Sequence, residues 1–357
     1  MCSYLKTLLV QLMRWTGLIR LFQFIHRHRI AILMIHGVMD DRDRAAWKPL
    51  RSQLAPDKLD AYLKLLGKRY RFVSLADAVQ MLAGRQPIQP YCMVLTFDDG
   101  YRNNLTHALP ILRRYHAPAV FFVPTGFVDK PRPFWFDRLD YALQQAAVDG
   151  REVSVGPFRM HLDASGRKAL RDSYTRLRRT AKKLQMSDHE FVDEMEQLAA
   201  ELEGESGRLL RDIQQDDDWS AIMTWEQIEA CQDADVTFGS HTVDHMRLDL
   251  VEPDTAREQM TKSKQAIEAH TRRDCFCLCY PNGSYSNVTI RLAERCGYRC
   301  ALTTDVGLNS VGDDLMTLKR VNLPTDGKAA DLLVDICGLS TAMSQIKAYM
   351  FRCADVA

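Results

Sequence analysis

Two acidic residues and two histidines are the side chains of this sequence best suited to chemistry. Asp98 and Asp99 end one apolar run, and His241 and His245 closely follow another. Two imidazoles and one carboxylate form the ligand set of a hydrolytic divalent-metal site, and the second carboxylate can serve as a base. Because adjacent side chains point apart, we expect one carboxylate to bind the metal and the other to face the substrate.

Stretches of strand and helix character alternate along the chain and predict how these side chains meet. The apolar stretches expected to be strands are 30–36, 93–97, 119–123, 236–238, 275–280, 299–303 and 318–323. Helices are expected near each of them, including closing helices that begin at Ala329 and Thr341. This alternation predicts parallel β/α units. In a β/α barrel the carboxyl ends of the strands share one rim, so His36, at the end of the first strand, should join the four residues above.

The alternation breaks between about residues 130 and 220, which we interpret as an insertion. A hairpin is expected at 153–162, followed by helices at 165–184 and 187–202. The first helix is basic and the second is acidic, which favours an antiparallel pair; contact of the basic face with an anionic lipid or polymer is the alternative. The aromatic segment 133–137 could stack on sugar rings or pack in the core.

Composition narrows the class of protein and its location. The net charge of +1 over 357 residues predicts no nucleic-acid partner, and the ten cysteines lack the spacing of a disulfide scaffold. Residues 1–29 carry five basic residues, no acid and apolar side chains at helical spacing. They predict an amphipathic helix that packs on the domain or lies on an anionic membrane. We see no signal peptide and expect a cytoplasmic protein, with peripheral contact to the inner membrane as the second reading.

Three motifs resemble those of the polysaccharide deacetylases, a carbohydrate esterase group, and in particular a subgroup that acts on exopolysaccharides. They are Thr96-Phe97-Asp98-Asp99-Gly100, His241-Thr242-Val243-Asp244-His245 and Tyr280-Pro281-Asn282-Gly283. The resemblance extends from about Ile30 to Leu323. It implies a distorted (β/α)7 barrel over residues 30–357, with the helical insertion at about 130–220.

The resemblance also implies roles for individual residues. Asp98 would be the general base, and Asp99, His241 and His245 would hold the metal. The third motif, Tyr280, Pro281 and Asn282, would contact the substrate, and a backbone N–H near Tyr280 would stabilise the oxyanion.

Three positions depart from the family pattern. Cys279 stands where an arginine usually orients the base, and Asp305 lacks its usual tryptophan partner, since Val306 follows it. Arg320 stands where a histidine usually protonates the leaving amine, and arginine is a poor general acid at pH 7. Our hypothesis is that His36 supplies this acid; the alternative is that it only packs beside the site.

These features predict a metal-dependent hydrolase that removes acetyl groups from N-acetylated sugars of a polysaccharide or a lipid-linked glycan. Zinc is the expected metal, because the ligands are two imidazoles and one carboxylate, and cobalt, nickel or manganese could replace it. The lost motif residues leave two alternatives open. One is a catalytically weak or inactive glycan-binding homologue, and the other is an O-acetyl esterase on the same scaffold.

Overall fold

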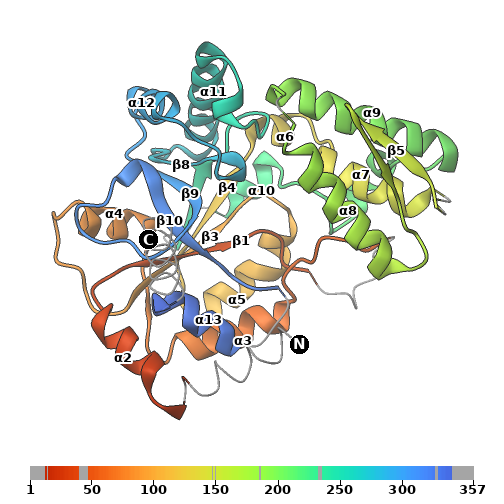
Figure 1. Cartoon of the computed structure of the whole chain (residues 1–357). Coiled ribbons are helices and arrows are strands. Elements are labelled where there is room, and N and C mark those ends of the chain that lie inside the picture. Colours follow the sequence, from red (N-terminus) through yellow and green to blue (C-terminus); the bar gives the residue numbers. More distant parts are fainter. Residues whose placement is uncertain are drawn as a thin grey trace, which may run out of the picture.

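The fold is a closed parallel β-barrel with a helical insertion on one side (Figure 1). It was obtained as a computed structural model that describes residues 13, 15–39, 47–146, 148, 150–184, 186–231, 235–325 and 329–339. Within these ranges, no helix has both the length and the hydrophobicity needed to cross a membrane. The predicted helix that begins at Thr341, and the first half of the predicted N-terminal helix, lie outside the described residues.

Seven strands form the barrel, and every pairing between them is parallel, as the alternation of strands and helices predicted. In spatial order they are β1 (Ala31–Ile35), β10 (Leu318–Asn322), β9 (Cys300–Val306), β8 (Cys277–Cys279), β7 (Val236–Ser240), β4 (Ala119–Val123) and β3 (Cys92–Phe97). Pairing of β3 with β1 closes the barrel, and the short β2 (Arg71–Phe72) pairs with β3 as an eighth strand.

Helices surround the barrel between the strands (Figure 1). They are α3 (Pro56–Leu66), α4 (Leu75–Leu82), α5 (Leu109–Arg114), α6 (Thr125–Asp129), α10 (Trp225–Ala230), α11 (Pro253–Thr271), α12 (Asn287–Arg295) and α13 (Ala329–Ile336). Side-chain caps begin three of them, α4, α10 and α12. Ser74 accepts the N–H of Asp77 at the start of α4, and Thr224 forms a capping box with Gln227 at the start of α10.

Side-chain alternation along the strands separates two cores. Ile32, Val94 and Val120 belong to one buried cluster, which also contains residues of α4, whereas Leu33 and Leu95 belong to another that contains residues of α3, α5 and α11. Successive strand residues point to opposite faces, so the first cluster fills the barrel and the second lies under the helices. By the same parity, residues 36, 98, 279 and 320 fall on the inner face of β1, β3, β8 and β10.

The insertion follows β4 and α6 and has its own core. It contains α7 (Trp135–Gln145), a hairpin of β5 (Glu152–Val155) and β6 (Phe158–His161), α8 (Arg167–Ala181) and α9 (Asp188–Ser206). The predicted pairing of α8 with α9 through opposite charges is wrong, because α9 packs chiefly on α7. Two acidic side chains of α9, Glu196 and Glu203, form ion pairs with Arg138 of α7.

The described part of the N-terminal region contains α2 (Leu18–Ile25), which packs beside α13. Ile19 is buried in a small cluster with Cys337 and Leu339. The opposite side of α2 exposes Leu21, whose side chain is 52% accessible, and Phe24, whose side chain is 55% accessible. The helix therefore has one apolar side on the domain and a second apolar side in solvent.

Candidate metal centre and catalytic rim

The residues singled out by type and spacing converge at one rim of the barrel. Asp98 and Asp99 follow β3, and His241 follows β7. Asp99 Oδ1 lies 3.6 Å from His241 Nε2 and 3.4 Å from His245 Nε2. These three side chains are close enough together to hold a single metal ion. Their donor atoms lie within 4.8 Å of one another, as the ligands of one divalent cation must.

Neighbouring groups fix the orientation of the histidine ligands. His241 Nδ1 lies 2.8 Å from the backbone carbonyl of Cys279, so this nitrogen carries the proton and leaves the Nε2 lone pair directed at Asp99. Gln259 of α11 accepts the backbone N–H groups of Val243 and Asp244, at 3.0 and 2.8 Å, and thereby holds the loop that carries His245. A donor set of two imidazoles and one carboxylate fits a divalent metal ion.

Left-handed backbone conformations aim several of these side chains. Asp99, Thr242, His245 and Asn282 have φ values of 72°, 65°, 57° and 56°. Such conformations cost about 1–3 kcal/mol each in residues other than glycine, and they persist where the surroundings demand them. Strand parity alone would turn Asp99 away from Asp98 and out of the barrel; the turn at Asp99 brings its carboxylate back to the histidines instead.

Arg320 holds Asp98, although its place in the motif pattern predicts no useful role for it. Arg320 Nη1 and Nη2 each lie 2.8 Å from one carboxylate oxygen of Asp98, which is a bidentate pair. Arg320 is 1% exposed, and its Nε donates to the Thr303 carbonyl at 2.7 Å. Its Nη2 also lies 3.2 Å from Cys279 Sγ. The inner-face parity of residue 320 was the one signal in the sequence that pointed to this contact.

The two carboxylates are both held in the ionised form, for different reasons. Burial alone would raise the pKa of Asp98, but the charge and hydrogen bonds of Arg320 outweigh it and lower that pKa below its usual value. Burial likewise opposes ionisation of Asp99, yet the adjacent side chains of His241 and His245 lower its pKa well below the usual value. Asp98 is thus a carboxylate ready to accept a proton.

A second group of potential ligands, Asp98, His241 and Cys279, also lies close together. It is the poorer metal site, because both oxygens of Asp98 are occupied by Arg320. Burial also raises the pKa of the Cys279 thiol, which disfavours the thiolate that a metal needs.

His36 lies at the end of β1, on the same rim, and its side chain is exposed. It lines a cavity of about 280 Å³ together with Arg51, Gln53 and Tyr101. Ile35 pairs with Phe97, so His36 and Asp98 are the next residues along two adjacent strands. An exposed imidazole at the mouth of the site can exchange protons with solvent and with a leaving group.

The three residues of the third motif lie in different environments. The backbone N–H of Tyr280 donates to the Leu302 carbonyl at 3.0 Å, so it is committed to the barrel and is not free to bind an oxyanion. Tyr280 and Pro281 are buried, whereas Asn282 is exposed and lines a cavity beside the metal ligands. Asn282 Oδ1 accepts a hydrogen bond from Lys182 Nζ at 2.7 Å, which ties the end of α8 to the rim.

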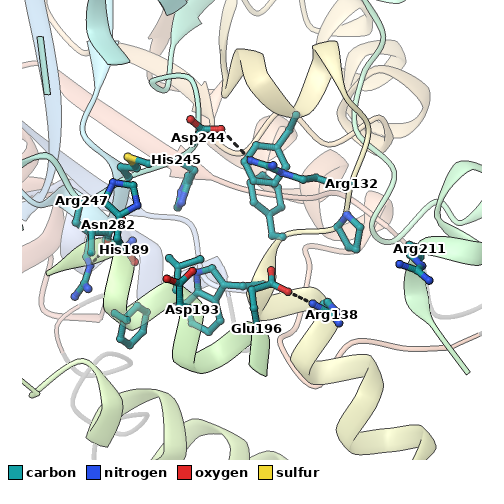
Figure 2. A pocket seen from close by; sticks show the side chains of 18 residues that line it. Arg132, Arg138, His189, Asp193, Glu196, Arg211, Asp244, His245, Arg247 and Asn282 are labelled. Atoms are coloured by element: carbon teal, nitrogen blue, oxygen red, sulfur yellow. Dashed lines mark hydrogen bonds and ion pairs between the residues drawn. The ribbon is translucent and has the colours of Figure 1, made fainter. Parts of the chain in front are cut away.

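A cavity of about 530 Å³ separates the metal ligands from the insertion (Figure 2). His245 and Asn282 line one side of it, and Asp193 and Glu196 of α9 line another. In the aromatic segment 133–137, Phe134 and Phe136 are buried and pack against the His245 ring, as core packing predicts. The partly exposed Trp135 lines the cavity, and stacking of a sugar on it stays a prediction.

Together, a closed seven-stranded parallel barrel and an Asp-His-His cluster beside a second carboxylate define a class of metal-dependent hydrolases. The family model for polysaccharide deacetylase matches residues 85–301, which is more than half of the chain. The protein therefore belongs to the polysaccharide deacetylase family.

Individual relatives agree with this assignment. Over 101 residues the chain is 29% identical to Bacillus subtilis YxkH, which is named as a polysaccharide deacetylase; the match covers 28% of this chain and 36% of that protein. Over 96 residues it is 32% identical to the poly-beta-1,6-N-acetyl-D-glucosamine N-deacetylase of Escherichia coli K12, covering 27% of this chain and 14% of that protein. The chain thus matches about a third and about a seventh of their lengths.

A solved structure shares the fold over most of both chains. The Streptococcus pyogenes deacetylase PplD, determined in complex with acetate, superposes with a TM-score of 0.56 and 19% sequence identity. The superposition covers 86% of this chain and 97% of that one. The barrel architecture is therefore that of deacetylases with known structures.

Proposed function

We propose that this protein removes acetyl groups from N-acetylated sugars of a polysaccharide or a lipid-linked glycan, in a metal-dependent hydrolysis. The observation that carries the proposal is the convergence of Asp99, His241 and His245 beside Asp98, which Arg320 holds ionised. Membership in the family supports the reaction class. The named substrate of the Escherichia coli relative supports an N-acetylated sugar.

Each residue has a distinct task in this scheme. Asp99, His241 and His245 hold the cation, for which we propose zinc, and when bound it polarises the acetyl carbonyl and lowers the pKa of a water molecule. Asp98 accepts the proton of the attacking water. His36 donates a proton to the sugar nitrogen as the C–N bond breaks, so the products are acetate and the free amine. Asn282 faces the acyl group from the rim.

The proposal is tested by mass spectrometry of N-acetylated oligosaccharides incubated with the purified protein. We expect the loss of one acetyl group and release of acetate, both stopped by a chelator and restored by added zinc. The His241→Ala variant should lose stoichiometric metal and activity. His189→Ala is the matched control, because His189 lines the same cavity outside the ligand set. Full metal content without acetate release would favour an inert glycan-binding homologue.

We further propose that the protein acts at the cytoplasmic side of a membrane, with α2 in contact with anionic lipid. Exposed Leu21, Phe24 and Ile25 on this helix, with the exposed Arg20 beside them, combine apolar and basic groups on one surface. Phe24→Ser should weaken sedimentation with phosphatidylglycerol vesicles more than with phosphatidylcholine vesicles. A protein that ignores both kinds of vesicle would exclude this contact.

A further inference from the structure

The His36 side of the rim opens into two adjoining cavities. The cavity of about 280 Å³ that contains His36 shares Pro49, Arg51, Ser52, Gln53 and Thr325 with a second cavity of about 430 Å³. The shared wall shows that the two lie next to each other. We call them together the basic groove, because its outer part is lined by Lys48, Lys58, Arg167 and Arg171.

The cations of the basic groove are held mostly by neutral acceptors. Lys58 Nζ donates to the Thr325 carbonyl at 2.7 Å. Arg167 Nη2 donates to the carbonyls of Lys48 and Pro49, at 2.8 and 2.7 Å. Arg171 is exposed and has no ion pair with any residue in the described ranges. Among the described residues, the single carboxylate that lines the groove is Asp57.

In the cavity on the other side of the rim, the arginines are paired with carboxylates. Figure 2 shows Arg132 with Asp244 and Arg138 with Glu196, and Arg138 also pairs with Glu203 and Arg247 with Asp188. Among the described residues, charge is therefore nearly balanced beside His245 and is in positive excess beside His36. A neutral acetylated sugar would gain nothing from such an excess, whereas an anionic group would be attracted by it.

We propose that the basic groove binds an anionic group of the substrate, a phosphate or a carboxylate attached to the glycan on the leaving-amine side of the acetylated sugar. This inference rests on the proposed function for the position of the sugar. Arg51 forms the inner end of the groove, where its Nη2 bonds Asp137 Oδ1 at 2.7 Å and Tyr101 at 3.0 Å. Lys58, Arg167 and Arg171 at the outer end supply the uncompensated charge. Such a groove selects charged glycans by attraction before the acetyl group reaches the metal ligands.

The test compares three probes of similar size. They are N-acetylglucosamine 1-phosphate, a disaccharide of glucuronic acid and N-acetylglucosamine, and neutral N,N′-diacetylchitobiose. Binding is measured by calorimetry with the full chain carrying zinc and Asp98→Asn, which prevents turnover. We expect the double variant Lys58→Met, Arg171→Met to weaken binding of one or both anionic probes by about ten- to hundredfold and to leave the neutral probe unchanged. The anionic probe that binds more tightly shows whether the groove prefers a phosphate or a carboxylate.

Arg179→Met is the matched control, because Arg179 is exposed on the same helix α8 and does not line the groove. Equal binding of charged and neutral probes, or equal losses in the control and the double variant, would overturn the proposal. Thermal melting shows whether each variant is folded. If the wild-type protein deacetylates none of the probes but binds the anionic ones through Lys58 and Arg171, anion binding by the basic groove is supported and the proposed function is wrong.

Discussion

Replacing Arg320 by methionine is expected to lower kcat/KM by about 10²- to 10⁴-fold, the range that a general base contributes. Both terminal nitrogens of Arg320 lie 2.8 Å from the carboxylate oxygens of Asp98. Without Arg320, the Asp98 carboxylate is no longer oriented and becomes a buried charge without its cation. Metal content should change little, because Arg320 contacts none of the three proposed ligands. Steady-state kinetics and metal analysis of the same preparation separate the two effects.

The pH profile of Arg320→Met should change in a specific direction. Arg320 depresses the pKa of Asp98, so in the wild type the base is ionised above that low pKa and is lost only in strong acid. Without Arg320, burial dominates and the pKa of Asp98 rises. The acidic limb of kcat/KM should then move to higher pH. An unchanged limb would show that Asp98 is not the group whose ionisation Arg320 controls.

A second arginine variant tests whether position or charge matters. In family members an arginine usually stands where this chain has Cys279, and Cys279 Sγ lies 3.2 Å from Arg320 Nη2. The variant Cys279→Arg, Arg320→Met should therefore recover part of the lost activity. Breaking a buried ion pair costs about 3–5 kcal/mol, so Arg320→Met alone is also expected to melt at lower temperature. If neither the double variant nor Arg320→Lys is more active than Arg320→Met, Arg320 has only a structural role.

Replacing His36 by alanine is expected to lower turnover of an N-acetylated sugar by about 10²- to 10⁴-fold while metal content stays intact. An amine leaves poorly unless it is protonated, and His36 is the exposed imidazole at the rim outside the proposed ligand set. The same variant should retain more activity on an O-acetyl ester, because an alkoxide depends less on a strong acid.

His189→Ala serves as the control for this variant too, since it removes an imidazole near the site without touching the His36 cavity. Near-normal turnover in His36→Ala would remove His36 from the mechanism. A wild-type protein that hydrolyses only the ester, with no dependence on His36, would favour the O-acetyl esterase.

The parallel barrel was predictable because its signal is local. Apolar runs such as 93–97 and 119–123 are bounded by helical segments, and the structure places β3 and β4 there as adjacent strands. The pairing of α9 was not predictable from charge. Arg138 of α7, rather than the basic α8, binds Glu196 and Glu203, because burial of apolar side chains determines which helices meet and charges adjust to that packing.

For the site, residue types and spacing alone pointed to two carboxylates, Asp98 and Asp99, and two imidazoles, His241 and His245. The resemblance to the family then assigned Asp99 to the metal and Asp98 to the base. Only the tertiary structure decided that Arg320, 222 residues away from Asp98, holds that carboxylate. Strand parity indicates that residue 320 faces the barrel interior, but it does not report which distant carboxylate the guanidinium meets, and the pairing of β10 with β9 shifts register between Leu318 and Arg320. The left-handed turn at Asp99 and the shared wall of the basic groove likewise depend on contacts between distant segments, which side-chain periodicity within one segment does not encode.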